Sequence, residues 1–249
     1  MSSIKENYLK VMEQIMKAAQ RSGRDSGEVK LVAVSKTVEV ARVREAIEAG
    51  VSILGENYVQ EAQKKIEELG QLACTEPASR SLAEGRRFGE GRPVAWHFIG
   101  HLQSNKAKYA VRLFDMIHSL DSIELAEELN RRAEREGQIV KVMIEVNLSG
   151  ETTKFGIEEE KAFDIARKVL NLKALSLMGL MTMPPYFDDS ELSRPYYIRL
   201  RELKEKMIKE GIPLRDLSMG MSNDFEIAIE EGATFVRVGT AIFGERKTK

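Results

Sequence analysis

The chain has 249 residues, of which 43% are hydrophobic, and its 38 Lys and Arg nearly balance its 39 Asp and Glu. This balance argues against a global field that would draw the protein onto nucleic acid or an anionic membrane. The single cysteine, Cys74, can form no intrachain disulfide and is interpreted as an incidental thiol. The N-terminus has no apolar segment typical of a signal peptide, and no apolar run approaches the roughly 18 residues of a membrane span. We therefore expect a cytoplasmic protein that binds neither membrane nor nucleic acid.

Short apolar segments alternate with longer segments of helical periodicity along the chain. After a first helix at 4–19, the predicted strands are 31–35, 51–55, 94–99, 115–119, 140–147, 174–182, 215–219 and 234–238. The predicted helices are 39–49, 57–69, 105–112, 121–136, 158–170, 190–210, 222–231 and a last short one. Such alternation produces parallel strands with right-handed crossovers. It predicts an α/β fold, a single TIM-like (β/α)8 barrel over residues 1–249, with the extra N-terminal helix on its outside or bottom. An open doubly wound sheet is the alternative.

Residues 71–92 interrupt this alternation. The segment is rich in Gly, Ser, Glu and Arg and has little apolar periodicity. It is longer than the usual loop between elements, so we predict a flexible insertion. Its arginines could attract an anionic partner, but a solvated charged loop is the more ordinary interpretation.

The first predicted strand leads directly into Lys36. In barrels of this kind, function gathers where the strands end, at the C-terminal mouth. A lysine there is partly desolvated, which lowers the pKa of its amine and favours the neutral form that attacks carbonyl groups. A lysine that keeps its ammonium in water is the alternative, and Lys36 alone does not decide between them.

The last predicted strand places Arg237 between two valines, where a charge is costly unless it meets a partner. Gly239 and Thr240 follow at the start of a short helix, whose backbone amides can approach an anion. After the preceding strand, Ser222 is predicted as a helix N-cap, and its hydroxyl can also bind phosphate. The loops after strands seven and eight are the usual phosphate site of such barrels. These residues therefore predict a phosphate site.

Seven segments resemble, in the same order, those of a known family. They are VAVSKT (32–37), GENYVQE (55–61), WHFIGHLQSNK (96–106), VNLSGETTKFG (146–156), GLMTM (179–183), LSMGMSNDFE (217–226) and RVGTAIFGER (237–246). On these blocks the chain resembles the YggS/PROSC family of pyridoxal 5′-phosphate (PLP) homeostasis proteins. That family is related to the barrel domain of alanine racemase, of fold type III. The segment 71–92 departs from the resemblance, because it is longer than expected for the family.

The resemblance implies a protein of intracellular PLP homeostasis that holds PLP as a Schiff base on Lys36, without dedicated catalytic turnover. It implies that Ser222, Gly239 and Thr240 bind the phosphate of PLP, that Arg237 faces the pyridine nitrogen, and that Asn57 lies near the ring. An arginine stays protonated, so a pyridine nitrogen facing it stays unprotonated and the ring is a weak electron sink. The implied partners are PLP, and free amino acids or apo-enzymes that accept PLP; a monomer is expected.

The alternative within this resemblance is a PLP-dependent amino-acid racemase or decarboxylase of fold type III. Racemases of this type use a second acid/base, a tyrosine from a C-terminal β domain of the partner subunit, and the chain continues only briefly after Arg237. No tyrosine lies in a segment that matches this role; those considered are Tyr58, Tyr109, Tyr186, Tyr196 and Tyr197. A phosphate-binding barrel enzyme without PLP is a third reading, which the combination of Lys36 with the phosphate residues disfavours.

The chain has three histidines, His97, His101 and His118. The spacing of the first two could suggest a metal site, but their segment is a strand that runs into a loop. With no third His or Cys nearby and no cluster of carboxylates, no metal site is predicted. We interpret all three as barrel-mouth histidines and take His97 as a candidate contact of the cofactor.

Overall fold

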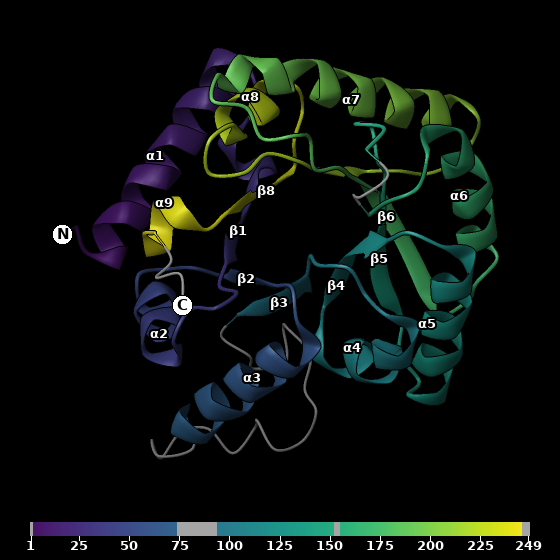
Figure 1. Ribbon diagram of the computed structural model, residues 1–249, viewed down its shortest axis with the longest axis horizontal. Helices are drawn as coiled ribbons and strands as arrows, with labels where there is room; N and C mark the ends of the chain where they lie inside the picture. Colours follow the sequence, from purple (N-terminus) through teal and green to yellow (C-terminus); the bar gives the residue numbers. More distant parts are fainter. Residues whose placement is uncertain (1, 74–93, 152–154, 246–249) are drawn as a thin grey trace.

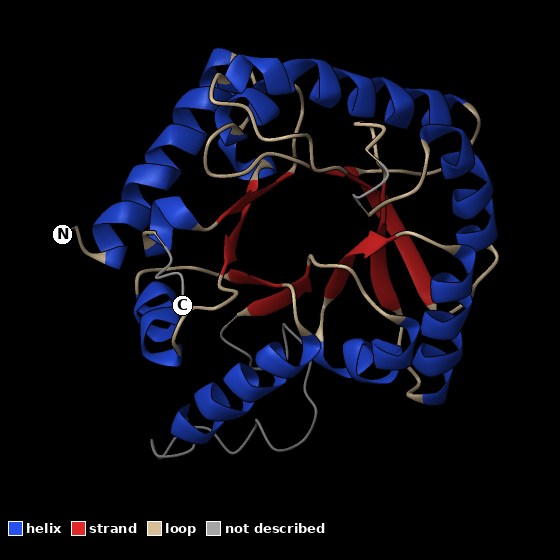
Figure 2. Cartoon of the chain, viewed as in Figure 1, coloured by secondary structure: helices blue, strands red, loops and turns tan. Residues whose placement is uncertain are grey.

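The computed structural model describes residues 2–73, 94–151 and 155–245. Within these residues, parallel strands hydrogen-bond in chain order and close into a barrel, with β1 paired to β8 (Figures 1 and 2). The strands are β1 (Lys30–Val34), β2 (Ile53–Glu56), β3 (Ala95–Phe98), β4 (Met116–Leu120), β5 (Val140–Glu145), β6 (Leu175–Met181), β7 (Asp216–Ser218) and β8 (Phe235–Val238). The predicted barrel is confirmed, and the open doubly wound sheet is wrong.

Helices surround the ring of strands (Figure 2). The α-helices are α1 (Ile4–Arg21), α2 (Val40–Glu48), α3 (Val59–Ala73), α4 (Ala107–Leu113), α5 (Ile123–Arg135), α6 (Ala162–Leu170), α7 (Arg194–Lys209), α8 (Phe225–Glu230) and α9 (Thr240–Phe243). Short 3-10 segments are η1 (Ser26–Glu28), η2 (Ser104–Lys106), η3 (Glu159–Lys161) and η4 (Ser190–Ser193). The order of helices and strands agrees with the sequence prediction.

The N-terminal helix α1 packs on the outside of the barrel, as predicted. It begins at a capping box in which Ser3 and Glu6 each bond the backbone of the other. It contacts α2, α8 and α9, and Asn7 donates a hydrogen bond to the carbonyl of Ile242 in α9. Because α9 has only four residues, it covers little of the barrel wall. Helix α1 occupies the position where a longer eighth helix would lie (Figure 1).

Apolar side chains form two separate layers, one inside the ring of strands and one between strands and helices. The inner layer is small and contains mostly long, flexible or β-branched side chains: Val32, Met116, Met143, Met181 and Phe235. The larger outer layer takes the helix faces and the outward strand residues. Since both faces of each strand are buried, the strands read as continuous apolar runs, as expected for a parallel sheet.

Two local predictions are corrected. The helix predicted at 222–231 begins at Phe225, with Asp224 in the N-cap position, so Ser222 is not an N-cap. The insertion predicted at 71–92 begins later than expected, because residues 71–73 belong to α3. Cys74 and the rest of the predicted insertion lie outside the described residues. Among the described helices, none combines the length and apolar character needed to cross a membrane.

Candidate functional site at the barrel mouth

Lys36 lies in the turn directly after β1, half-buried at the C-terminal mouth, where the sequence predicts it. The next residue, Thr37, has a φ of 61°. This left-handed conformation is costly for a β-branched residue and persists only where the surroundings hold it. The backbone amide of Thr37 donates to Oε1 of Glu61 in α3, at 2.5 Å. The strained turn thus sets the direction in which the chain presents Lys36.

A buried lysine of α3, Lys65, supports the same turn from below. Its Nζ donates to the carbonyl of Ser35 at 2.5 Å and to Glu56 and Glu61 at 2.7 Å each. Glu56 also accepts from the Ser35 hydroxyl at 2.7 Å. Burial raises the pKa of Glu56, while the ammonium of Lys65 acts in the opposite direction. The cluster therefore ties β1, β2 and α3 together immediately beneath Lys36.

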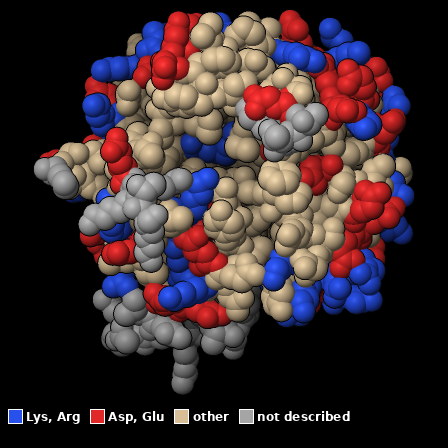
Figure 3. Space-filling view, viewed as in Figure 1, with Lys and Arg blue, Asp and Glu red and all other residues tan. Residues whose placement is uncertain are grey.

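The register of the neighbouring strands brings the predicted residues to one level. Val34 pairs with Gly55 of β2, and Ala33 pairs with Val238 of β8. Lys36 therefore lies between the end of β2, where Asn57 follows, and the end of β8, where Gly239 follows. Figure 3 shows the face viewed along the barrel, with a hollow over the ring of strands and basic atoms, in blue, at its edge.

The loop after β7 meets the start of α9 through Ser222. The Ser222 hydroxyl oxygen accepts from the amide of Gly239 at 3.1 Å and from the amide of Ala241 at 3.5 Å. Thr240, the first residue of α9, is exposed beside them. Two amides at a helix start therefore converge on one oxygen, which is the arrangement that anions use at such positions. The chain also needs a glycine here, because a Cβ on Gly220 would lie 2.6 Å from Ala228 Cβ.

Arg237 is 4% exposed and points into the barrel from β8. Its guanidinium donates to Ser218 Oγ at 2.7 Å and to the carbonyl of Thr182 at 2.9 Å. Burial lowers its pKa, and the negative charges of neighbours such as Glu145 partly oppose that effect. The buried positive charge of Arg237, which the sequence indicated as costly, is thus stabilised mainly by hydrogen bonds to neutral acceptors. No carboxylate among the described residues forms an ion pair with it.

Two buried histidines continue this hydrogen-bond chain across the barrel. Ser218 Oγ lies 2.8 Å from Nδ1 of His118, and Nε2 of His118 lies 2.9 Å from Nδ1 of His97. Burial lowers the pKa of His97 to about 3 and that of His118 well below its ordinary value, so both rings are neutral. Ser218 Oγ accepts a hydrogen bond from Arg237, so we assign its hydroxyl as the donor to Nδ1 of His118. His118 then carries its proton on Nε2, which donates to Nδ1 of His97.

This arrangement corrects the interpretation of His97. It lies in the barrel interior against Phe235, with ring centroids 5.6 Å apart, and the charges of Lys30 and Lys141 reach it from the early parts of their strands. His118 and Ser218 separate it from Arg237. His97 is therefore a residue of the barrel interior and not of its mouth.

His101 has a different environment from the other two histidines. It stacks on Phe155 at 3.9 Å between ring centroids, and its Nδ1 lies 2.9 Å from Oδ2 of Asp121. The two histidines of the H-x3-H spacing thus have separate partners and do not converge. Among the residues that the structure describes, no group of three or more His, Cys, Asp or Glu is placed to hold a metal ion.

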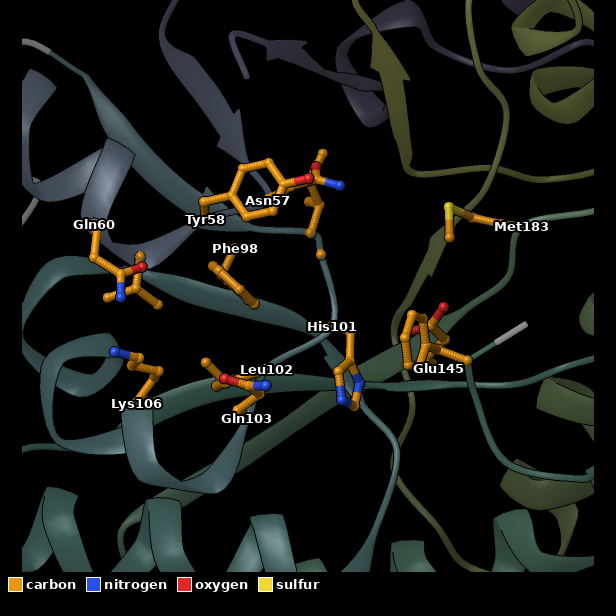
Figure 4. Close-up of a pocket in the computed structure, with 14 residues that line it drawn as sticks. Asn57, Tyr58, Gln60, Phe98, His101, Leu102, Gln103, Lys106, Glu145 and Met183 are labelled. Carbon is orange, nitrogen blue, oxygen red and sulfur yellow. The ribbon is translucent and has the colours of Figure 1, made fainter. Parts of the chain in front are cut away.

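A cavity of about 520 Å³ opens next to Asn57, between the loops that follow β2, β3 and β5 (Figure 4). Asn57 Oδ1 is buried and has no hydrogen-bond partner among the described residues. A Cβ on Gly100 would lie 2.6–2.9 Å from Asn57, so only glycine lets the two loops approach this closely. Asn57 thus borders both this cavity and the turn of Lys36.

Glu145, the last residue of β5, lines the same cavity and is 3% exposed. Burial and, to a smaller extent, the charge of Asp121 raise the pKa of its carboxyl to about 7, whereas Arg237 acts in the opposite direction. No described residue donates a hydrogen bond to this carboxyl. Nothing in the sequence singled Glu145 out, because it continues an apolar strand as an isolated acidic residue.

The tyrosines considered as acid/base groups are dispersed. Tyr58 lines the cavity beside Asn57, and Tyr109 and Tyr186 are exposed. Tyr196 packs against Phe187 at 6.0 Å between ring centroids. Tyr197 is fully buried in the outer core, and burial raises the pKa of its hydroxyl.

Comparison with known proteins gives the class of this barrel. Residues 4–247 match the family described as the N-terminal domain of alanine racemase. Among curated proteins, the chain is 44% identical over 243 residues to the pyridoxal phosphate homeostasis protein of Aquifex aeolicus, covering 97% of this chain and 98% of that protein. The corresponding protein of Pseudomonas aeruginosa is 41% identical over 246 residues, covering 99% and 97%. The chain therefore belongs to the pyridoxal phosphate homeostasis protein family.

Solved structures agree with this assignment. PipY of Synechococcus elongatus, solved with PLP bound, is 33% identical and superposes with a TM-score of 0.78 over 97% of this chain and 100% of that chain. An alanine racemase of Clostridium difficile shares the fold at a TM-score of 0.67 and 14% identity; the match covers all of this chain and 58% of that one. At this identity, the racemase shows the shared fold alone.

Proposed function

We propose that this protein binds PLP at the barrel mouth, holds it as a Schiff base on Lys36, and serves intracellular PLP homeostasis without catalytic turnover. One observation carries the proposal: a half-buried lysine after β1 lies level with two converging amides after β8. PLP combines an aldehyde, which a lysine amine can attack, with a phosphate, which helix-start amides bind. The PLP that PipY holds in its solved structure supports the same conclusion.

Each predicted residue has a proposed role. Lys36 supplies the amine, and Ser222, Gly239 and Thr240 take the phosphate. Arg237 would face the pyridine nitrogen, and the buried Oδ1 of Asn57, which has no hydrogen-bond partner among the described residues, fits a polar contact near the ring. Two further residues support these roles: Ser218 and Thr182 orient the guanidinium of Arg237.

The neutral partners of Arg237 support the absence of turnover. A protonated pyridine nitrogen, which a carboxylate partner would stabilise, makes the PLP ring a stronger electron sink and so favours carbanion chemistry. A guanidinium at this place, fixed by a hydroxyl and a carbonyl, donates hydrogen bonds and accepts none. A pyridine nitrogen that accepts a hydrogen bond from this guanidinium would stay unprotonated. The family's name as homeostasis proteins is consistent with a binding role.

Exchange of the α-proton separates this function from the racemase or decarboxylase alternative. The protein loaded with PLP is incubated with single enantiomers of several amino acids in deuterium oxide. We expect no exchange and no loss of chirality beyond the rate with free PLP, although spectral shifts from reversible amine binding can occur. Enzyme-like exchange or decarboxylation that disappears in Lys36→Ala would establish the alternative.

A further inference from the structure

The cavity beside Asn57 contains an acidic group that forms no ion pair with the described residues. Glu145 is 3% exposed, and none of the described residues donates a hydrogen bond to its carboxyl. A buried carboxylate without a donor or a counter-ion is costly, and such a group in a cleft is a candidate for a binding site. The proposed roles for PLP use other residues and leave Glu145 without a function.

The groups that face Glu145 keep this end of the cavity acidic. Asp121, in the loop after β4, adds a second negative charge and is bound to His101 of the loop after β3. The one cation that acts on Glu145 in the described structure, Arg237 of β8, gives its hydrogen bonds to Ser218 and Thr182. A cation inside the cavity would therefore meet an acceptor to which the described residues donate no hydrogen bond.

The remaining walls of the cavity define the rest of the ligand. Phe98, Phe155 and Met183 give it apolar and aromatic surface. Figure 4 shows Glu145 and His101 at one end of the cavity, with Gln60 and Lys106 at the other. The volume of about 520 Å³ lies in the range of small-molecule sites. A metal ion is a poor fit, since no third donor joins Glu145 and Asp121 in the part of the chain that is described.

We propose that this cavity binds a small organic amine, with its ammonium group against Glu145 and its apolar body against Phe98, Phe155 and Met183. Binding of an amine here does not require PLP, so this proposal can be tested separately from the function proposed above. The proposal gives the mouth two neighbouring pockets, one for the cofactor and one for an amine. Asn57 separates them and borders both.

A tertiary amine tests this proposal without reaction at the cofactor. N,N-dimethylphenethylamine carries a positive charge between pH 6 and 8 but cannot form a Schiff base. Its binding to the full-length protein is measured by calorimetry beside that of 2-phenylethanol, which has the same aromatic body and no charge. At pH 8 we expect the amine to bind at least tenfold more tightly than the alcohol.

Two variants assign the binding to Glu145. Glu145→Gln keeps the shape of the side chain and removes its charge, so the preference for the amine should disappear. Glu48→Gln, an exposed change at the end of α2, should retain it. In the wild type the amine affinity should fall as the pH decreases from 8 to 6, because the carboxyl becomes protonated with a pKa of about 7; in Glu145→Gln it should stay constant.

The comparison of amine with alcohol in the wild type does not depend on any variant folding correctly. Equal binding of the two compounds, or binding of neither, would overturn the proposal. So would an amine preference that survives in a folded Glu145→Gln protein.

Discussion

At the scale of single residues, the site combines groups that the sequence reveals with groups that it hides. Arg237 is visible because a charge inside an apolar strand requires a partner. Ser218, on the preceding strand, and His118, 100 residues before Ser218, complete its hydrogen-bond chain and look like ordinary polar residues in the sequence. Glu145 gave no signal in the sequence, since the lack of a hydrogen-bond donor to its carboxyl among the described residues is visible only in the folded structure.

Ser222 shows how a correct residue can carry a wrong local interpretation. The serine before an apolar helix predicted an N-cap, but the helix begins three residues later, at Phe225. The Ser222 hydroxyl is oriented toward β8 and α9, where the amides of Gly239 and Ala241 reach it. A contact between two separate loops leaves no periodic pattern in the sequence. The sequence therefore indicated Ser222 but not the amides that it contacts.

The phosphate cradle makes a prediction at this scale. Thr240→Val and Ser222→Ala should each weaken PLP binding by about 1–3 kcal/mol, the cost of leaving a charged acceptor short of one donor. The measurement is a titration of the cofactor-free protein, followed by absorbance. Pyridoxal, which lacks the phosphate, is the matched ligand and should bind equally well to the wild type and to both variants. If both variants bind PLP as the wild type does, the phosphate lies elsewhere.

At the scale of elements, the sequence predicted types and order better than boundaries. The helix predicted at 190–210 is divided into η4 and α7, and a proline in the first turn of α7 marks the division. The strand predicted at 140–147 ends at Glu145, after which Val146 only forms a bridge with Ile157. Such ends are set by contacts with neighbouring strands, which the local sequence does not contain.

The support of the Lys36 turn by α3 makes a prediction at the element scale. Lys65→Met removes a buried ammonium and leaves Glu56 and Glu61 uncompensated, so the free energy of unfolding should fall by about 3–5 kcal/mol. PLP should also be lost more easily, because the strained Thr37 turn loses its support. Denaturant unfolding and cofactor dissociation are the two measurements.

The neighbouring residue of α3 supplies the control. Lys64 is exposed and pairs only with Glu68 on the helix surface, at 3.7 Å. Lys64→Met should therefore change the free energy of unfolding by no more than about a few tenths of a kcal/mol. It should leave the retention of PLP unchanged. A Lys65→Met protein with unchanged stability would show that the cluster does not hold the turn.

At the scale of the whole molecule, the repeated alternation of strands and helices was sufficient to predict the closed barrel. The position of α1 beside α8 and α9 was predicted only as outside or bottom, because packing against a short last helix has no sequence signature. The resemblance to a known family supplied the roles of Lys36 and Asn57, which the fold places at one mouth but whose chemistry the residues alone leave open. The neighbouring cavity became visible only with the arrangement of the loops that follow β2, β3, β5 and β6.

The site of covalent attachment tests the central claim most directly. The protein loaded with PLP is reduced with borohydride, digested, and analysed by mass spectrometry, together with Lys36→Ala and with Lys106→Ala, a lysine of the adjacent cavity. We predict the added mass on the peptide that contains Lys36 in the wild type and in Lys106→Ala, and neither label nor imine absorption in Lys36→Ala. A label on another lysine, or an unchanged absorption band in Lys36→Ala, would contradict the account.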